Sequence, residues 1–104
     1  MIRKAFKMKA YPEQIEEYIK RHNPIWTELE VVLKNHGVHN YSIFFDSETN
    51  ILFGYAELES EEKWKSIAET EICKKWWTHM APLMETNSDS SPVSKDLKEV
   101  FHMP

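Results

Sequence analysis

"VHNYSIFFDSETNILFGYAELE", residues 38–59, has the pattern of two β-strands joined by a polar turn. The strands are expected at about residues 38–46 and 50–59. Apolar residues occupy both parities of each strand, as Tyr41 and Phe44 illustrate in the first. Antiparallel strands that are apolar on both faces need a cover on each side. We therefore expect helices on one face of this hairpin and a second subunit on the other.

The segment before the hairpin predicts two helical pieces. A helix is expected over residues 11–22, with Pro12 near its first turn and acidic residues following, as the N-terminal end of a helix prefers. Asn23 and Pro24 should break or kink this helix, because the residue before proline avoids the helical region. A second piece is expected over residues 24–37, where Gly37 suits a left-handed C-cap.

The segment after the hairpin predicts a second helical region. Ser60 is a suitable N-cap for a helix, although Lys63 stands where a capping box has Glu or Gln. Residues 71–84 continue as a further helix that is kinked or stopped near Pro82. A polar loop over residues 85–92 then follows.

The two ends of the chain predict the outer strands. Residues 2–10 have apolar residues of one parity, and residues 97–103, "LKEVFHM", are expected to form a closing strand. The complete order of strand, helix, strand, strand, helix, strand is that of the ferredoxin-like α+β fold, with both helices on one face of an antiparallel sheet. We expect one domain over residues 1–104, and a homodimer in which two sheets form a dimeric α+β barrel.

Composition and charge exclude several classes of protein. The net charge is −4, and basic residues are interleaved with acidic ones, so a nucleic acid is not an expected partner. No apolar run approaches the ~20 residues of a membrane span, and no signal peptide is visible at the N-terminus. Cys73 is the only cysteine, which fits a reducing cytoplasm, and we interpret it as a small core residue.

Tyr18 and His22 are the first candidates for a functional site. On a helix they lie one above the other, on the same side as the apolar residues Ile15, Ile19 and Trp26. One interpretation is that both polar groups find hydrogen bonds at the edge of the core. The alternative is that they line a pocket between helix and sheet, where histidine suits proton transfer because it titrates near neutral pH.

The aromatic residues Trp76, Trp77 and Tyr41 are the next candidates. Adjacent tryptophans on a helix point about 100° apart, so both cannot face the same part of the core. Either one packs in the core while the other lines an opening, or both are core residues. Indole faces can stack on the C–H faces of sugars, and the ring N–H can donate to a hydroxyl group. Tyr41 has a strand parity that allows it to face the helices.

The sequence contains no pattern typical of a metal or nucleotide site. It lacks a glycine-rich phosphate loop, a GxSxG motif, an HExxH pair and clustered cysteines. His36 and His39 flank a helix end and so form a poor ligand pair. We therefore expect no metal and no cofactor, and an enzyme of this sequence would use acid–base chemistry alone.

Five stretches together resemble the L-rhamnose mutarotase family. They are "YIKRHNPIWTELEVVLKNHGVHNYSIF" (18–44), "LFGYAELESEEKWKSIAET" (52–70), "CKKWW" (73–77), "SSPVS" (90–94) and "LKEVF" (97–101). The resemblance runs from about Arg3 to Pro104, and the stretch around "RHNPIW" is specific. Thr27 stands where family members often have proline, at a helix start and away from any functional position.

The resemblance implies a cofactor-independent, dimeric enzyme of ferredoxin-like fold that interconverts the α and β anomers of L-rhamnopyranose. His22 matches the family's proton donor. The family's sugar-binding positions match Tyr18, Tyr41, Trp76 and Trp77. The hypothesis is that His22 protonates the ring oxygen while Tyr18 orients the substrate or the histidine. The general base is open between water, a second tyrosine and a carboxylate.

Two other functions are alternatives. The first is a cofactor-free monooxygenase, because other dimeric α+β barrel proteins oxidise aromatic substrates in similar pockets. The second is a non-catalytic module that binds a small ligand, in which His22 has only a structural role.

Overall fold

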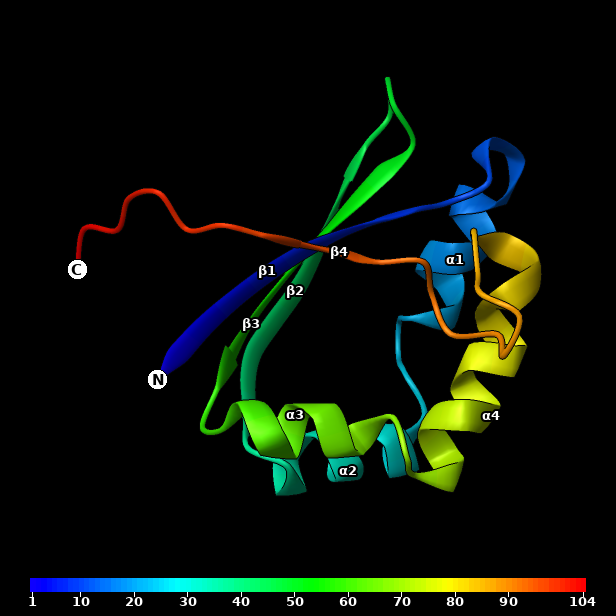
Figure 1. The fold of residues 1–104 in the computed structure, drawn as a ribbon. Helices are drawn as coiled ribbons and strands as arrows, with labels where there is room; N and C mark the ends of the chain where they lie inside the picture. Colours follow the sequence, from blue (N-terminus) through cyan, green and yellow to red (C-terminus); the bar gives the residue numbers. More distant parts are fainter.

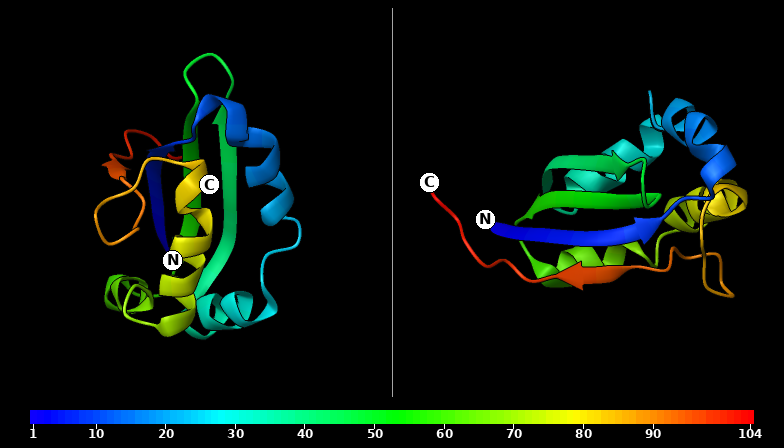
Figure 2. Two further views of the ribbon diagram at one scale, coloured as in Figure 1. Left: turned by 90° about the vertical axis from the view of Figure 1, so that its right-hand side faces the viewer. Right: turned by 90° about the horizontal axis from the view of Figure 1, so that it is seen from above.

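The computed structural model describes all residues, 1–104, and contains one four-stranded antiparallel sheet with the strand order β2-β3-β1-β4. The strands are β1 (Ile2–Lys9), β2 (Val38–Asp46), β3 (Ile51–Leu58) and β4 (Lys95–Leu97). The helices are α1 (Ile15–Arg21), α2 (Thr27–Asn35), α3 (Glu61–Ile67) and α4 (Glu71–Met80), with short 3-10 turns at Pro12–Gln14 and Ala81–Leu83. All helices lie on one side of the sheet, which we call its inner face (Figures 1 and 2). The predicted ferredoxin-like fold is confirmed.

Each of the two helical connections is broken into two pieces. Between α1 and α2 the chain turns at Asn23 and Pro24, which are joined by a cis peptide bond. The second piece was predicted from residue 24 but begins at Thr27, because Trp26 has an extended backbone with ψ 134°. As a result α1 and α4 lie at one end of the sheet, and α2 and α3 lie at the other (Figure 1).

Serine and threonine side chains cap the N-terminal ends of α3 and α4. The hydroxyl oxygen of Ser60 accepts a hydrogen bond from the backbone N–H of Lys63 at 3.3 Å, which confirms the predicted N-cap. Thr70 does the same for Cys73 at 3.3 Å. These caps fix where α3 and α4 start.

A β-bulge determines which side chains of β2 face the helices. His39 pairs with Glu57 and Ser42 with Tyr55, so that two residues of β2 lie opposite one residue of β3. The bulge is made by Asn40, which adopts the left-handed region with φ 47°, where asparagine is tolerated. Its side-chain amide donates to a carboxylate oxygen of Glu57 at 2.8 Å. After the bulge the odd-numbered residues, beginning with Tyr41, share the inner face.

The predicted closing strand over residues 97–103 is wrong in position. The strand is β4, Lys95–Leu97, and it pairs with Ala5, Phe6 and Lys7 of β1. Beyond it the chain makes no ladder hydrogen bonds and is held to β1 by the ion pair between Arg3 and Glu99, at 2.6 Å. Its alternating apolar residues imitated a strand, but they remain exposed, and the C-terminus runs away from the body of the protein (Figure 1).

The core lies on the inner face of the sheet and is divided into two clusters. The larger contains ten buried residues: Phe6, Met8, Ala10, Tyr18, Leu29, Leu52, Trp76, Met80, Leu83 and Met84. The smaller contains five: Val38, Ala56, Leu58, Ile67 and Cys73. None of the helices over this core has both the length and the apolar character that crossing a lipid bilayer requires.

Replacing Gly54 by alanine should destabilise the fold. Gly54 lies opposite Phe6 in the sheet, and an added Cβ would lie 2.4 Å from the tip of its ring. That ring is buried and packs against Tyr41 and Trp64. We expect Gly54→Ala to lower the free energy of unfolding by about 1–3 kcal/mol in urea denaturation. Adding Phe6→Leu should recover part of this loss, and equal stability of Gly54→Ala and wild type would contradict the argument.

Candidate active site

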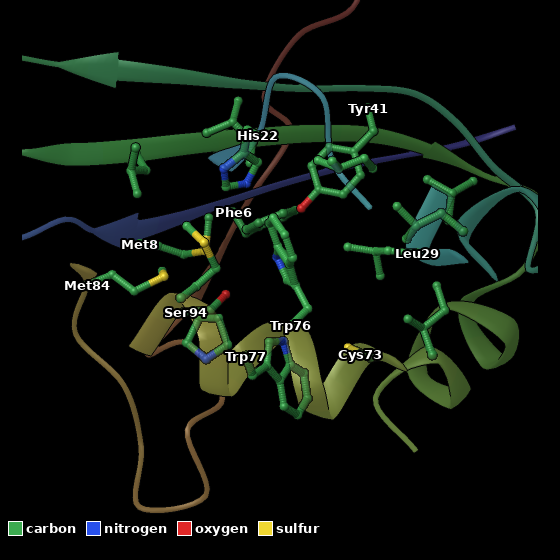
Figure 3. Close-up of a pocket in the computed structure, with 18 of the residues that line it drawn as sticks. Phe6, Met8, His22, Leu29, Tyr41, Cys73, Trp76, Trp77, Met84 and Ser94 are labelled. Atoms are coloured by element: carbon green, nitrogen blue, oxygen red, sulfur yellow. The ribbon is translucent and has the colours of Figure 1, made fainter. Parts of the chain in front are cut away.

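A cavity of about 1030 Å³ lies between the inner face of the sheet and the helices (Figure 3). Its volume is at the upper end of the range for pockets that hold small molecules. Most of its wall is apolar, with a few polar groups among aromatic rings. The cavity brings together all five site residues predicted from the sequence: Tyr18, His22, Tyr41, Trp76 and Trp77.

His22 lies at the C-terminal end of α1, where the helix is broken. Its Nδ1 atom is 2.9 Å from the backbone carbonyl oxygen of Tyr18. A carbonyl oxygen can only accept, so Nδ1 carries the proton and donates. The Nε2 atom makes no hydrogen bond within the chain, and its residue lines the cavity. In its neutral form His22 therefore offers the lone pair of Nε2 to a ligand.

Two rings hold the imidazole of His22 in place. The ring of Tyr18 stacks on it with centroids 4.3 Å apart. The indole of Trp76 contacts it in a T-shaped arrangement at 5.2 Å. Burial between these rings lowers the pKa of His22 below its ordinary value of 6.5, and the hydrogen bond to the Tyr18 carbonyl offsets only part of this effect. The imidazole is thus neutral at pH 7.

Tyr18 and Tyr41 present two phenol groups that have no partner within the chain. Tyr18 is only 4% exposed, and neither hydroxyl makes an intramolecular hydrogen bond. Tyr41 is 37% exposed as a whole residue and lines the cavity. Burial of the hydroxyl groups raises the pKa of both tyrosines well above the ordinary value of 10. Both phenols therefore remain protonated and can donate to a ligand.

Trp76 and Trp77 both line the cavity, as the family resemblance implied and although helix geometry alone left open whether both could do so. Trp76 is buried and belongs to the larger core cluster, while Trp77 is half-buried and packs against both clusters. Neither indole N–H has a hydrogen-bond partner within the chain. The two residues offer indole faces together with two free donors.

The carboxylates of the cavity wall are paired with lysines. Asp96 lies 3.3 Å from the ammonium group of Lys4, and Glu30 lies 2.9 Å from that of Lys34. The acidic, histidine and cysteine side chains do not gather into any group of three that could hold a metal ion. Of the groups on this wall, His22 alone offers the free lone pair of a ring nitrogen, because burial lowers its pKa and keeps the imidazole neutral at pH 7.

Comparisons with known proteins match nearly the whole chain to one family. A family model described as L-rhamnose mutarotase matches residues 3–103. The chain belongs to the L-rhamnose mutarotase family. An L-rhamnose mutarotase of Oceanobacillus iheyensis is 62% identical over 103 residues, which cover 99% of each chain. The crystal structure of an L-rhamnose mutarotase from Formosa agariphila superposes with a TM-score of 0.92 at 46% identity, covering 100% of both chains.

A more distant structure shares the fold alone. A dimeric ferredoxin-like protein from an uncultured marine organism superposes with a TM-score of 0.67 at 14% identity. The superposition covers 98% of this chain and 96% of the chain of that protein. The fold of the mutarotase family is therefore also found in proteins with little sequence similarity to it.

Two residues that support the site in this member of the mutarotase family were given no role from the sequence. The rings of Trp26 and Trp76 make a T-shaped contact with their centroids 5.0 Å apart. The ring centroid of His79 lies 5.6 Å from that of Trp76 and 5.0 Å from that of Trp26. Arg21 fixes the same region, because its guanidinium donates to the backbone carbonyl of His79. In the sequence, the only signal for this packing was that Trp26 falls on the same side as Tyr18 and His22.

The pKa of His22 can be tested directly. Because burial lowers it, the NMR titration of the His22 ring protons should have a midpoint below 6.5. Any activity that needs the neutral imidazole should then be constant above about pH 7 and fall on the acid side with the same midpoint. A midpoint above 6.5 would show that the charged form is favoured and would contradict this account.

Proposed function

We propose that this protein is an L-rhamnose mutarotase in which His22 carries the proton transfers. The observation that supports this most is the arrangement of His22 at the cavity, with Nδ1 held by the Tyr18 carbonyl and Nε2 free. Membership of the L-rhamnose mutarotase family supports the substrate. The reaction interconverts the α and β anomers, which differ in the face of C1 that carries the hydroxyl group.

The four aromatic residues are proposed to bind the sugar. The phenols of Tyr18 and Tyr41 and the indole N–H groups of Trp76 and Trp77 have no partner within the chain, so a sugar hydroxyl can pair with each. The indole faces can pack on the C–H groups of the ring. Because the tyrosines remain protonated, they act as donors and not as the general base.

His22 is proposed to serve both as the base and as the acid. Nε2 first takes the proton of the C1 hydroxyl, and the electron pair left on O1 forms the C1=O1 double bond. The bond between C1 and the ring oxygen breaks with its electron pair on that oxygen, which takes the proton back from Nε2. The products are the open-chain aldehyde and a neutral imidazole. One nitrogen suffices because both oxygens are bonded to C1 and lie side by side.

Ring closure then follows the same steps in reverse. Rotation about the C1–C2 bond presents the other face of the aldehyde to the C5 hydroxyl group. Nε2 takes the hydroxyl proton as the oxygen attacks C1, and the proton passes to O1. No proton is gained or lost over the cycle. This keeps the predicted role of His22 as proton donor and identifies the general base as the same side chain.

This chemistry needs neither a metal nor an organic cofactor, and we propose that the enzyme works without one. A positioned acid–base group contributes about 10²–10⁴-fold to a rate. Spontaneous mutarotation is already an easy reaction, so that contribution is sufficient. We also propose a cytoplasmic location, which a single free and buried thiol suits. Burial raises the pKa of that thiol, Cys73, to about 11, which keeps it protonated and unreactive.

The function is tested by the exchange between the two anomeric signals of L-rhamnose in saturation-transfer NMR. We expect the wild-type protein to accelerate exchange and His22→Gln to reduce the catalysed rate by about 10²–10⁴-fold. His36→Gln is a matched control, because His36 makes the same bond to a backbone carbonyl, that of Val32, but does not line the cavity. It should keep the wild-type rate.

The other outcomes of this experiment identify the alternative functions. L-rhamnose binding without faster exchange would leave a non-catalytic module that binds a small ligand. Oxygen consumption with phenols, in place of exchange, would identify the cofactor-free monooxygenase. Full exchange in His22→Gln would keep the mutarotase but remove His22 from the chemistry.

We also propose that the protein is a homodimer that buries the outer face of the sheet. This face carries exposed aromatic residues at Phe44, 66% exposed, and Phe53, 37% exposed, which pair with each other across β2 and β3. Tyr55 and Leu97 lie on the same face on either side of Ala5. No helix of this chain covers it (Figure 2). A second copy would supply an identical set of exposed aromatic residues, and a protein of the same fold is described as dimeric.

A charge on the outer face should therefore break the dimer. We expect wild type to have about twice the 12.4 kDa chain mass in light scattering, and Phe44→Glu with Phe53→Glu to have the mass of one chain. Val31→Glu places a charge at an exposed apolar residue of α2 and should leave the dimer intact. A monomeric wild-type protein at micromolar concentration would refute the proposal.

A further inference from the structure

The stretch "SSPVS", residues 90–94, has no role in the function proposed above, although it forms one wall of the cavity. Ser90, Ser91, Pro92 and Ser94 line the cavity on the side of β4. His22 and Tyr18 belong to α1, and Tyr41 belongs to β2. The wall formed by this stretch therefore comes from a different part of the fold than most of the proposed site.

Backbone hydrogen bonds hold the loop that carries this stretch. The N–H of Val93 donates to the carbonyl of Glu85 at 3.1 Å, and the N–H of Asn87 donates to that of Ser91 at 2.7 Å. The hydroxyl of Ser91 is used within the loop, because it donates to Asp89 and accepts from the Asn87 amide. The loop is thus a defined hairpin, and the hydroxyl of Ser91 is not available to a ligand.

Sheet register places Ser94 on the inner face. Asp96 pairs with Phe6, and Lys95 pairs with Lys7, where the ladder ends. Ser94 directly precedes β4, and extending the register by one residue sets it opposite Met8. Residues opposite each other in an antiparallel pair point to the same face. Phe6 and Met8 are buried on the inner face. Figure 3 shows Ser94 at the cavity on the side of Met84 and Trp77, across from His22.

Ser94 is an exposed residue whose hydroxyl adds a polar group to the cavity wall between apolar side chains and the polar groups of Asp96 and Trp77. This hydroxyl makes no hydrogen bond within the chain. Its neighbours at the cavity, Met8, Met84 and Phe6, have no donor that could pair with a sugar hydroxyl. A sugar hydroxyl that displaces water from this side of the cavity keeps a hydrogen bond there if it pairs with the Ser94 hydroxyl.

We propose that Ser94 is a substrate-binding residue, whose hydroxyl hydrogen-bonds one of the ring hydroxyls at C2, C3 or C4 of the bound 6-deoxyhexose. With C1 and the ring oxygen at His22, a contact on the opposite wall fixes the sugar at two ends. Ser94 then determines which hydroxyl configuration the cavity accepts. This inference rests on the mutarotase function proposed above.

The test compares Ser94→Ala with wild type in steady-state mutarotation of L-rhamnose. We expect KM to rise about three- to tenfold, because one hydrogen bond to the sugar is lost. The kcat should stay within about twofold, because that bond is equally present in the ground state and the transition state. Ser88→Ala is the matched control, since Ser88 belongs to the same loop but does not line the cavity. Ser94→Thr keeps the hydroxyl and should keep KM near the wild-type value.

Deoxy sugars identify the bonded hydroxyl and separate a binding role from a structural one. Of the 2-, 3- and 4-deoxy derivatives of L-rhamnose, one should have the same KM with wild type and Ser94→Ala, because it lacks the partner hydroxyl. A general disturbance of the cavity would raise KM for all three. The proposal is overturned by an unchanged KM in Ser94→Ala, by a Ser94→Thr variant that behaves like alanine, or by an equal rise for all three derivatives.

The failure of this inference can be distinguished from the failure of the mutarotase function. If wild type does not accelerate exchange, the mutarotase function is wrong, and Ser94 is then judged by L-rhamnose binding in saturation-transfer difference NMR. Weaker binding to Ser94→Ala than to Ser88→Ala would still support the contact. Equal binding, or no binding to wild type, would remove it.

Discussion

The break in each helical connection is the constraint on which the site depends. A continuous helix laid on the sheet would fill the space above β1 and β3 with its own side chains. Here the chain turns at Asn23 and Pro24 and again between α3 and α4, so the helices gather at the two ends of the sheet (Figure 1). The core is accordingly divided into two clusters, and a cavity remains on the inner face.

The first of these breaks also sets the chemistry of His22. At the C-terminal end of α1 the last carbonyl groups have no partner in the next turn, so that of Tyr18 is available to accept from Nδ1. The same backbone group thus satisfies the helix end and selects the tautomer of the imidazole. Trp76 packs against His22 on one side and against Trp26 and His79 on the other, so the position of the base depends on α1, α4 and the connection to α2.

The sequence predicted the elements whose signals are local and missed those that depend on distant partners. The hairpin strands and the Ser60 cap rest on neighbouring residues, and both are present. The closing strand was misplaced because alternating apolar residues do not reveal whether a partner strand is within reach. Spacing could relate Tyr18 to His22 on one helix, but only the family resemblance joined them to Trp76. Ser94 was missed because its direction follows from its register with β1, which no local pattern contains.

The bulge at Asn40 makes the two ends of β2 differ in how they tolerate insertions and deletions. Val38, before the bulge, and Tyr41 and Ile43, after it, all face the helices, although a regular strand would place even- and odd-numbered residues on opposite faces. Removing one residue here would turn the phenol of Tyr41 out of the cavity together with every later side chain of the strand. No residue of the turn over residues 46–50 lines the cavity, and a change of length within that turn leaves the register of Tyr41 unchanged. In this chain an insertion or deletion is therefore compatible with the tip of the hairpin and incompatible with its base.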